Sequence, residues 1–291
     1  TAATLDFAAV MAQSARIYDK PDREWSKKAL AAAVKAWDWA ILNNNIAYAN
    51  PKDVATGAYD DDKFSDDFYW AAAELYITTL DHKYHEYLKN SQEPYIHEIT
   101  NSWKFFVRNN GFHSLILSDK SLDKSLIENL KTKHLELSDS IVNIIEEHPY
   151  KIALNRYEWG SNSDILNQAM ILCIAHSISK NEKYLRAAEQ INDYIFGKNA
   201  TAYCFLTGYG HKQIMFPHHR PSGADGIVNP IPGFIAGGPN IHMQDKSQVD
   251  YPNKFPAKAY VDTEDSYASN EVCINWNSPA VFVLAYLEQN R

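Results

Sequence analysis

Residues 65–76 read SDDFYWAAAELY, and this run decides the fold class of the chain. Ser65 or Asp66 can cap a helix here, because a short polar side chain accepts a hydrogen bond from a free backbone N–H of the first turn. The acidic pair Asp66 and Asp67 also favours that first turn, where the helix dipole stabilises negative charge. We therefore expect a helix that begins directly after residue 65 or 66 and continues through Tyr76.

Helical patterns continue on both sides of this run. Apolar residues recur at helical spacing within residues 2–18 and 25–42, and a short polar link that contains Pro21 joins the two into a hairpin. We find neither a run of alternating strands nor a Gly/Ser-rich linker, so the sequence predicts one all-α domain over residues 1–291. Further helices are expected near residues 94–107, 122–147, 162–179, 181–196 and 278–288.

The composition changes between residues 198 and 277, where Gly, Pro, Asn and His dominate and the helical spacing of apolar residues is lost. Compact domains rarely leave so long a stretch irregular without a functional reason. Binding and catalytic residues concentrate on such loops above a rigid scaffold. A disordered insertion is the alternative, but the Trp, Tyr, Phe and Ile content of the region disfavours it.

Composition excludes several classes of partner. Acidic residues outnumber basic ones, 36 against 28, so nucleic acid and anionic membranes are not expected partners. No apolar run reaches membrane-spanning length, and the first residues of the sequence do not have the basic-then-apolar pattern of a signal segment. Its 3 cysteines form neither a disulfide framework nor a cysteine zinc site. The 7 Trp and 18 Tyr suit a cleft that stacks flat, uncharged rings, although core aromatics explain them equally well.

The first half of the irregular region contains a histidine and arginine pair. Residues 206–212 read LTGYGHK and residues 216–223 read FPHHRPSG. Residues two apart in extended chain point the same way, so His218 and Arg220 would reach into one site and bind hydroxyl groups. A polar surface turn would have the same composition.

The second half contains a candidate general acid. Residues 260–279 read YVDTEDSYASNEVCINWNSP, and Ser278 followed by Pro279 predicts the start of the last helix. Glu271 then lies on the loop before that helix. Its neighbours Val272, Cys273, Ile274 and Trp276 would partly desolvate the carboxyl group, raise its pKa and keep it protonated as a general acid. A solvated loop acid is the alternative.

These two stretches resemble the paired active-site motifs of glycoside hydrolase family 9. In the first motif, a Pro or hydrophobic residue, His, any residue and Arg fall on residues 217–220, and Cys204 stands where the family usually has Ser, Thr or Val. In the second, an aromatic, Asp, a second aromatic and Glu fall at the family's spacing on Tyr260, Asp262, Tyr267 and Glu271, and Cys273 replaces a usual Ser, Thr or Ala. Residues 66–76 and 157–162 also look like family landmarks.

The resemblance implies an (α/α)6 barrel whose loops form an open cleft for a β-1,4-linked glucan. Glu271 would protonate the leaving oxygen while a separate aspartate activates water, with inversion. Asp262, His218 and Arg220 would orient the sugar and the acid. Trp276, Trp159 and Tyr267 would bind the substrate.

The family's catalytic base belongs to an Asp-Ala-Gly-Asp stretch upstream of residues 1–18, and these 291 residues contain no such stretch. Fewer helices are readable than the twelve of the family's barrel. We therefore expect a barrel that is incomplete at its N-terminal side, with an upstream segment of the same enzyme as partner. The family resemblance also implies a secreted, extracellular or periplasmic protein.

A structural calcium ion is a further expectation. Asp61, Asp62, Asp66 and Asp67 supply hard oxygen atoms within a short span, which suits calcium, and family members often carry calcium near the equivalent of Asp66 and Asp67. A solvated acidic loop is the alternative. The chemistry itself needs no cofactor.

Three functions remain open at this point. The first is an endo-acting cellulase. The second is an exo-acting hydrolase of cello-oligosaccharides or glucosaminides in the same family. The third is a glucan-binding fragment without activity, because the base is absent from these residues.

Overall fold

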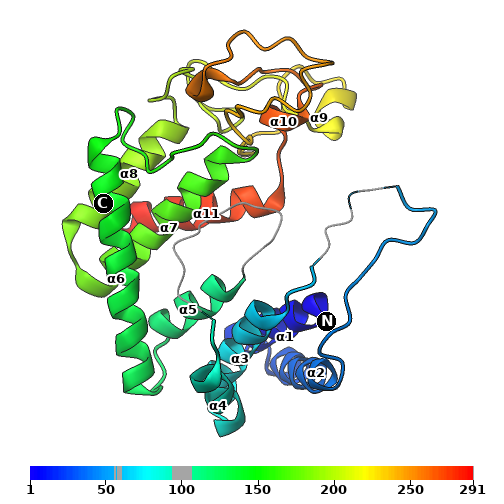
Figure 1. Ribbon diagram of the computed structural model, residues 1–291, viewed down its shortest axis with the longest axis vertical. Coiled ribbons are helices and arrows are strands. Elements are labelled where there is room, and N and C mark those ends of the chain that lie inside the picture. The colour runs from blue at the N-terminus through cyan, green and yellow to red at the C-terminus, as the bar shows by residue number, and fades with distance from the viewer. Residues whose placement is uncertain (56, 58–60, 94–106, 291) are drawn as a thin grey trace. The chain divides into compact units, whose positions relative to one another are not determined.

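Figure 1 shows the computed structural model, which describes residues 1–55, 57, 61–93 and 107–290. In these residues the regular elements are helices, and β pairing is confined to isolated bridges, which confirms the all-α fold class. No helix among them is both long and apolar enough to cross a membrane. The α-helices are α1 (Ala2–Ile17), α2 (Arg23–Leu42), α3 (Ser65–Thr79), α4 (His82–Asn90), α5 (Arg108–Leu117), α6 (Lys124–Glu147), α7 (Ser161–Ser179), α8 (Glu182–Ile195), α9 (Arg220–Ala224), α10 (Tyr267–Asn270) and α11 (Ile274–Gln289), and η1 (Pro256–Lys258) is a 3-10 helix.

Most of the long helices follow the predicted ranges. The stretches expected near 2–18, 25–42, 122–147, 162–179 and 181–196 are α1, α2, α6, α7 and α8. The helix expected at 94–107 falls, except for its last residue, outside the described residues. Helix α4 was not predicted, because it buries only Tyr84 and Leu88 and so lacks a long apolar period.

Contacts divide the described chain into two compact units. The first contains the described residues up to Lys133, and the second runs from His134 to Asn290, so that α6 contributes to both. The acidic run and the family landmark of residues 66–76 belong to the first unit. Both motif stretches of the irregular region belong to the second.

The predicted hairpin of α1 and α2 is confirmed in the first unit. Asp22 caps α2 by accepting a hydrogen bond from the backbone N–H of Trp25 at 2.9 Å. The indole N–H of Trp25 donates to Ser14 Oγ at 2.9 Å, and Ser26 Oγ donates to the carbonyl of Ala15 at 2.8 Å. These bonds tie the start of α2 to the end of α1.

Helix α3 begins at Ser65, one or two residues before its predicted start, because its predicted cap is wrong. Phe64 is the N-cap residue, and no side chain caps the helix. One carboxylate oxygen of Asp66 instead accepts a hydrogen bond from the backbone N–H of Val107 at 2.9 Å. The acidic side chain of the first turn is therefore used to hold a distant segment.

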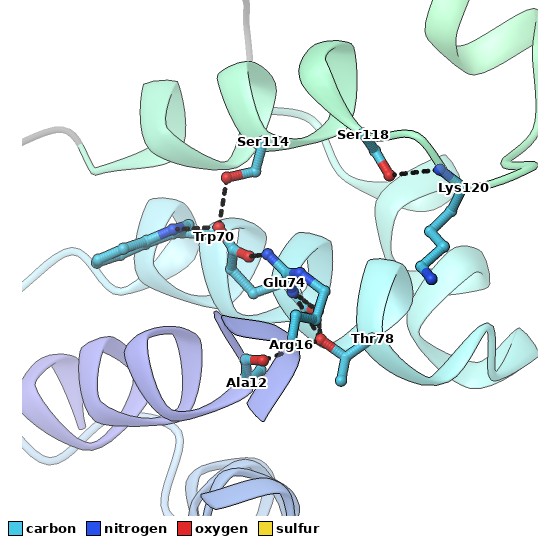
Figure 2. A network of polar contacts seen from close by, with 8 residues as sticks. All are labelled: Ala12, Arg16, Trp70, Glu74, Thr78, Ser114, Ser118 and Lys120. Atoms are coloured by element: carbon cyan, nitrogen blue, oxygen red, sulfur yellow. Dashed lines mark hydrogen bonds and ion pairs between the residues drawn. The ribbon is translucent and has the colours of Figure 1, made fainter. Parts of the chain in front are cut away.

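Buried Glu74 fixes α1 and α5 against α3, as Figure 2 shows. Its side chain has no exposed surface. It forms an ion pair with Arg16 and accepts hydrogen bonds from the indole N–H of Trp70 at 3.2 Å and from Ser114 Oγ. A buried carboxylate that lost such partners would be strongly destabilising, so this network specifies how the three helices pack.

Helix α11 in the second unit begins earlier than Ser278 and Pro279 predict. It starts at Ile274 with Cys273 as N-cap, and Pro279 lies inside it. Proline has no N–H to donate to the carbonyl four residues before it. Ser278 Oγ donates to that carbonyl, of Asn275, at 3.3 Å instead, which explains why the helix tolerates the proline.

Acid should destabilise the second unit through His134 of α6. This side chain is fully buried, and burial lowers its pKa from 6.5 to about 4, while a ring nitrogen lies 2.9 Å from the carbonyl of Ile171. Between these values the unfolded chain binds a proton that the folded chain does not. The stabilisation is therefore complete above about pH 6.5 and is lost as the pH falls towards 4, by roughly 3 kcal/mol.

Urea unfolding at neutral and acidic pH tests this contribution. His134→Gln should lose less stability on acidification than the parent chain, because glutamine does not titrate. His211→Gln, at an exposed position, is the matched control and should behave like the parent. An equal acid sensitivity of His134→Gln and the parent would contradict the assignment.

Candidate active site

The irregular region lies at one end of α7 and α8 within the second unit (Figure 1). Its long irregular character is as predicted, and α9, η1 and α10 are short helices within it. A parallel bridge pairs His218 with Glu271, and an antiparallel bridge pairs Ala236 with Val272. The two motif stretches, separate in sequence, are therefore neighbours at the candidate acid.

Glu271 directly follows α10 in extended conformation. Its backbone carbonyl accepts a hydrogen bond from the N–H of Gly237 at 2.9 Å, and its carboxyl group accepts one from the indole N–H of Trp159 at 3.0 Å. Burial raises the pKa of Glu271, and the opposing effects of the Trp159 bond and the charge of His218 are smaller. The carboxyl group is thus held at a fixed place with an increased tendency to keep its proton.

The predicted source of this desolvation is partly wrong. Ile274 is 89% exposed and does not shield the acid. The rings of Trp159 and Tyr267 lie 5.4 Å apart, and the ring of His218 is 6.3 Å from that of Tyr267. A cluster of three rings from distant parts of the chain thus lies beside Glu271, in addition to the residues that are next to it in sequence.

His218 has a defined orientation beside the acid. Its backbone N–H donates to the carbonyl of Asn270 at 2.9 Å, and its Nδ1 bonds to the carbonyl of Glu264. A carbonyl can only accept, so Nδ1 carries a proton. Nε2 is then the ring nitrogen that can face a sugar hydroxyl.

Asp262 is hydrogen-bonded to the protein backbone in this structure. Its two carboxylate oxygens accept hydrogen bonds from the N–H groups of Met215 and Phe216, at 2.8 and 2.9 Å, and one also accepts from the side chain of Asn270 at 3.2 Å. It therefore holds the segment that leads to His218. This arrangement fits the predicted orienting role through the loop.

The remaining predicted substrate-binding residues differ in exposure. Arg220 is exposed and starts α9, whereas Trp159 and Tyr267 are half-buried beside Glu271. Trp276 is only 7% exposed, and a Cβ built at Gly237 would come within 2.9 Å of its ring. The expectation that Trp276 stacks on a sugar does not fit this burial, and its ring instead supports the chain next to the acid.

Asn270 is a functional residue that sequence reasoning missed. Its buried side-chain amide donates to the carbonyl of Phe216 at 2.6 Å, and its side-chain oxygen accepts a hydrogen bond from the hydroxyl group of Tyr260. The residue thus connects both motifs. Its position directly before Glu271 was the available signal, but its partners lie up to 54 residues away.

Asp245 was also missed. It is fully buried and accepts hydrogen bonds from the hydroxyl groups of Tyr251 and Ser266, both at 2.8 Å, and from the backbone N–H of Ala268 at 3.0 Å. Ala268 belongs to α10, which leads directly into Glu271. The carboxylate of Asp245 therefore anchors the turn that carries the acid.

The predicted metal ligands Asp66 and Asp67 are buried in the first unit. Burial is the largest cause that raises the pKa of Asp67, and repulsion from Asp6, Asp66 and Asp61 adds to it. Oδ2 of Asp67 and Oδ1 of Asp6 are buried without a hydrogen-bond partner among the described residues. Asp6, absent from the prediction, joins this carboxylate cluster from α1.

Comparison with known proteins gives one family. The model of glycosyl hydrolase family 9 matches residues 1–284. A xyloglucan-specific endo-beta-1,4-glucanase of Bacteroides ovatus is 38% identical over 304 aligned residues, which cover 98% of this chain and 51% of that protein. A cellodextrinase of Butyrivibrio fibrisolvens is 32% identical, with coverage of 97% and 55%.

The crystal structure of a thermostable endoglucanase (D468A) from Alicyclobacillus acidocaldarius matches with a TM-score of 0.89 at 31% identity. The match covers 98% of this chain and 55% of that one. The chain thus spans about half the length of the relatives it matches. The fold is accordingly that of part of an (α/α)6 barrel.

Loss of the indole N–H of Trp159 should raise the pKa of Glu271 further. Trp159→Phe keeps an aromatic ring but cannot donate to the carboxylate, so the charged form of Glu271 loses a stabilising bond. Carbon-13 NMR titration of the glutamate carboxyl groups measures the change. Trp39→Phe, at an exposed position in the first unit, is the control. An unchanged or lower pKa in Trp159→Phe would refute this bond as a determinant.

Proposed function

The chain belongs to glycosyl hydrolase family 9, and on this basis we propose that it is part of an inverting endo-β-1,4-glucanase in which Glu271 is the proton donor. The single observation that carries the proposal is the environment of Glu271. Its carboxyl group is half-buried, its pKa is raised, and His218 of the other motif is paired with it along the backbone. These are the properties that a general acid needs near neutral pH.

The proposed reaction divides the work between residues. Glu271 donates its proton to the glycosidic oxygen as the bond to the leaving sugar breaks. Nε2 of His218 and the guanidinium group of Arg220 bind hydroxyl groups of the sugar, and Trp159 and Tyr267 offer ring faces to its CH groups. Asp262 acts as a positioning residue, since its carboxylate holds the segment before His218.

Inversion also needs a base that activates a water molecule on the opposite face, about 6.5–9.5 Å from the acid. We propose that this base comes from a further segment of the enzyme, which the greater length of the matched relatives supports. The substrate is a β-1,4-glucan, either cellulose or a related polysaccharide. Such a polymer is met outside the cytoplasm, and we propose a secreted, extracellular or periplasmic enzyme.

An exo-acting hydrolase of cello-oligosaccharides or glucosaminides is the second candidate. The observation that favours it is the similarity to a protein named as a cellodextrinase. Both candidates use Glu271 in the same role. Viscosity loss relative to the release of reducing ends distinguishes them, because internal cleavage shortens the polymer with few cuts.

Calcium is the cation we propose for the carboxylates of the first unit. Asp66 and Asp67 would hold the ion, and the unpartnered oxygens of Asp67 and Asp6 favour a positive charge there. The alternative is a proton held between Asp6 and Asp67. The ion would stabilise the fold and take no part in the reaction.

Replacing Glu271 with Gln should abolish proton donation while the shape is kept. We expect hydrolysis of cellotetraose to fall by about 10²–10⁴-fold, the usual contribution of a positioned acid. The assay uses a polypeptide that contains residues 1–291 together with upstream residues. Glu264→Gln, at an exposed position, is the control for loss of a nearby loop acid.

Full activity of Glu271→Gln would refute the acid assignment. Residues 1–291 alone should turn over negligibly, and turnover should appear when the upstream residues are present. Glucan binding without turnover in both polypeptides would instead establish the binding-fragment function.

Calcium should raise the thermal unfolding temperature of the parent chain, and Asp67→Asn should remove that response. Without calcium, Asp67→Asn should be at least as stable as the parent, since it removes a charge from a repelling cluster. Differential scanning fluorimetry with and without calcium measures both effects. Asp119→Asn, at an exposed position in the same unit, should respond like the parent. An undiminished response of Asp67→Asn would overturn the site.

A further inference from the structure

A second group of potential metal ligands lies at the start of α4 in the first unit, outside the residues assigned to glucan or calcium. His82, His85 and Glu86 occupy positions i, i+3 and i+4, which face the same way on a helix. One ligand atom from each lies within 4.8 Å of the others. Among the described residues, this is the one group of three or more histidine, cysteine and acidic side chains whose ligand atoms lie that close together.

Asp123, in the segment before α6, lies beside this group and is the candidate for a fourth ligand, although the mutual distances within 4.8 Å hold for the other three side chains. Its Oδ2 lies 3.3 Å from Nε2 of His85. Its Oδ1 is already used, since it accepts a hydrogen bond from the N–H of Leu126 at 2.8 Å. The carboxylate is therefore held with one oxygen directed at the histidine.

His85 is also held in place. Its ring stacks on that of Tyr76 at 4.9 Å, with 13° between the planes, and the hydroxyl of Tyr76 accepts from the N–H of Asp123 at 3.2 Å. Tyr76 thus orients both potential metal ligands, His85 and Asp123. Nε2 of His85 is buried and, within the described part of the chain, makes no hydrogen bond beside its 3.3 Å approach to Asp123.

We propose that His82, His85, Glu86 and Asp123 bind a zinc ion. Two imidazoles and two carboxylates make a four-ligand set that zinc accepts, and the two carboxylates neutralise its charge. Ligands about 2.0–2.1 Å from a tetrahedral zinc ion lie roughly 3.3–3.4 Å from one another. Nε2 of His82 and Oε1 of Glu86 are 3.3 Å apart, as are Nε2 of His85 and Oδ2 of Asp123.

The proposed ion would join segments that are distant in sequence. Helix α4 packs on α3, and zinc would also tie it to the residue that precedes α6. Lys89 competes with the ion, because its Nζ lies 3.3 Å from the same Oε1 of Glu86. Removal of this lysine should therefore strengthen zinc binding, which is opposite to the effect of removing a ligand.

Zinc binding is measured on the chain of residues 1–291 after chelator treatment, by competition with a chromophoric zinc chelator in the presence of excess calcium. We expect one zinc ion per chain and a rise in unfolding temperature. His82→Ala and His85→Ala should weaken binding at least about tenfold, and Lys89→Ala should tighten it. His211→Ala, an exposed histidine outside the group, should bind like the parent.

Cobalt(II) gives an independent readout, since a four-coordinate site produces intense visible absorption that His82→Ala should abolish. The side chain of His82 is 79% exposed, so this variant is expected to fold even if His85→Ala does not. The proposal is overturned if His82→Ala binds zinc as tightly as the parent, or if His211→Ala and His82→Ala lose affinity equally. The result for zinc does not bear on the calcium proposal, which concerns Asp66 and Asp67 and is tested separately.

Discussion

The buried side chain of Asn270 holds the two motif segments together, and the geometry of the candidate acid depends on it. Its amide donates to the carbonyl of Phe216 at 2.6 Å, and its side-chain oxygen accepts from the hydroxyl of Tyr260. Its own carbonyl accepts the backbone N–H of His218 at 2.9 Å. Because Glu271 is the next residue, any movement of Asn270 would displace the acid relative to His218.

The carboxyl groups near Asn270 differ in the number of hydrogen bonds that they accept. Asp262 accepts from two backbone N–H groups and one amide, and Asp245 accepts from two hydroxyls and one N–H, so both carboxylates hold the loops in place. Glu271 is half-buried and accepts one bond, from Trp159, which leaves its pKa raised. These different environments agree with the proposed division, in which Glu271 donates a proton and Asp262 positions the loop.

Sequence patterns predicted what depends on near neighbours. They placed the start of α3 within two residues of Ser65. The family resemblance of the two motifs, and no local pattern, predicted that His218 and Glu271 share one site, and the structure pairs them. Sequence patterns failed where a distant partner competes. The carboxylate of Asp66 bonds to Val107 and does not cap α3, and the chain around Trp276 buries a ring that was expected to be open. No local sequence pattern identifies Asn270 or Asp245, because their hydrogen-bond partners come close only when the segments of the irregular region fold together.

Amide hydrogen exchange in Asn270→Ala tests this account most directly. Asn167→Ala removes a side-chain bond within α7 and serves as the matched control. We expect the N–H groups of Met215, Phe216 and His218 to exchange faster in Asn270→Ala, while the first unit is unchanged. Unchanged exchange of these three groups in a folded Asn270→Ala chain would show that the motif segments do not depend on Asn270.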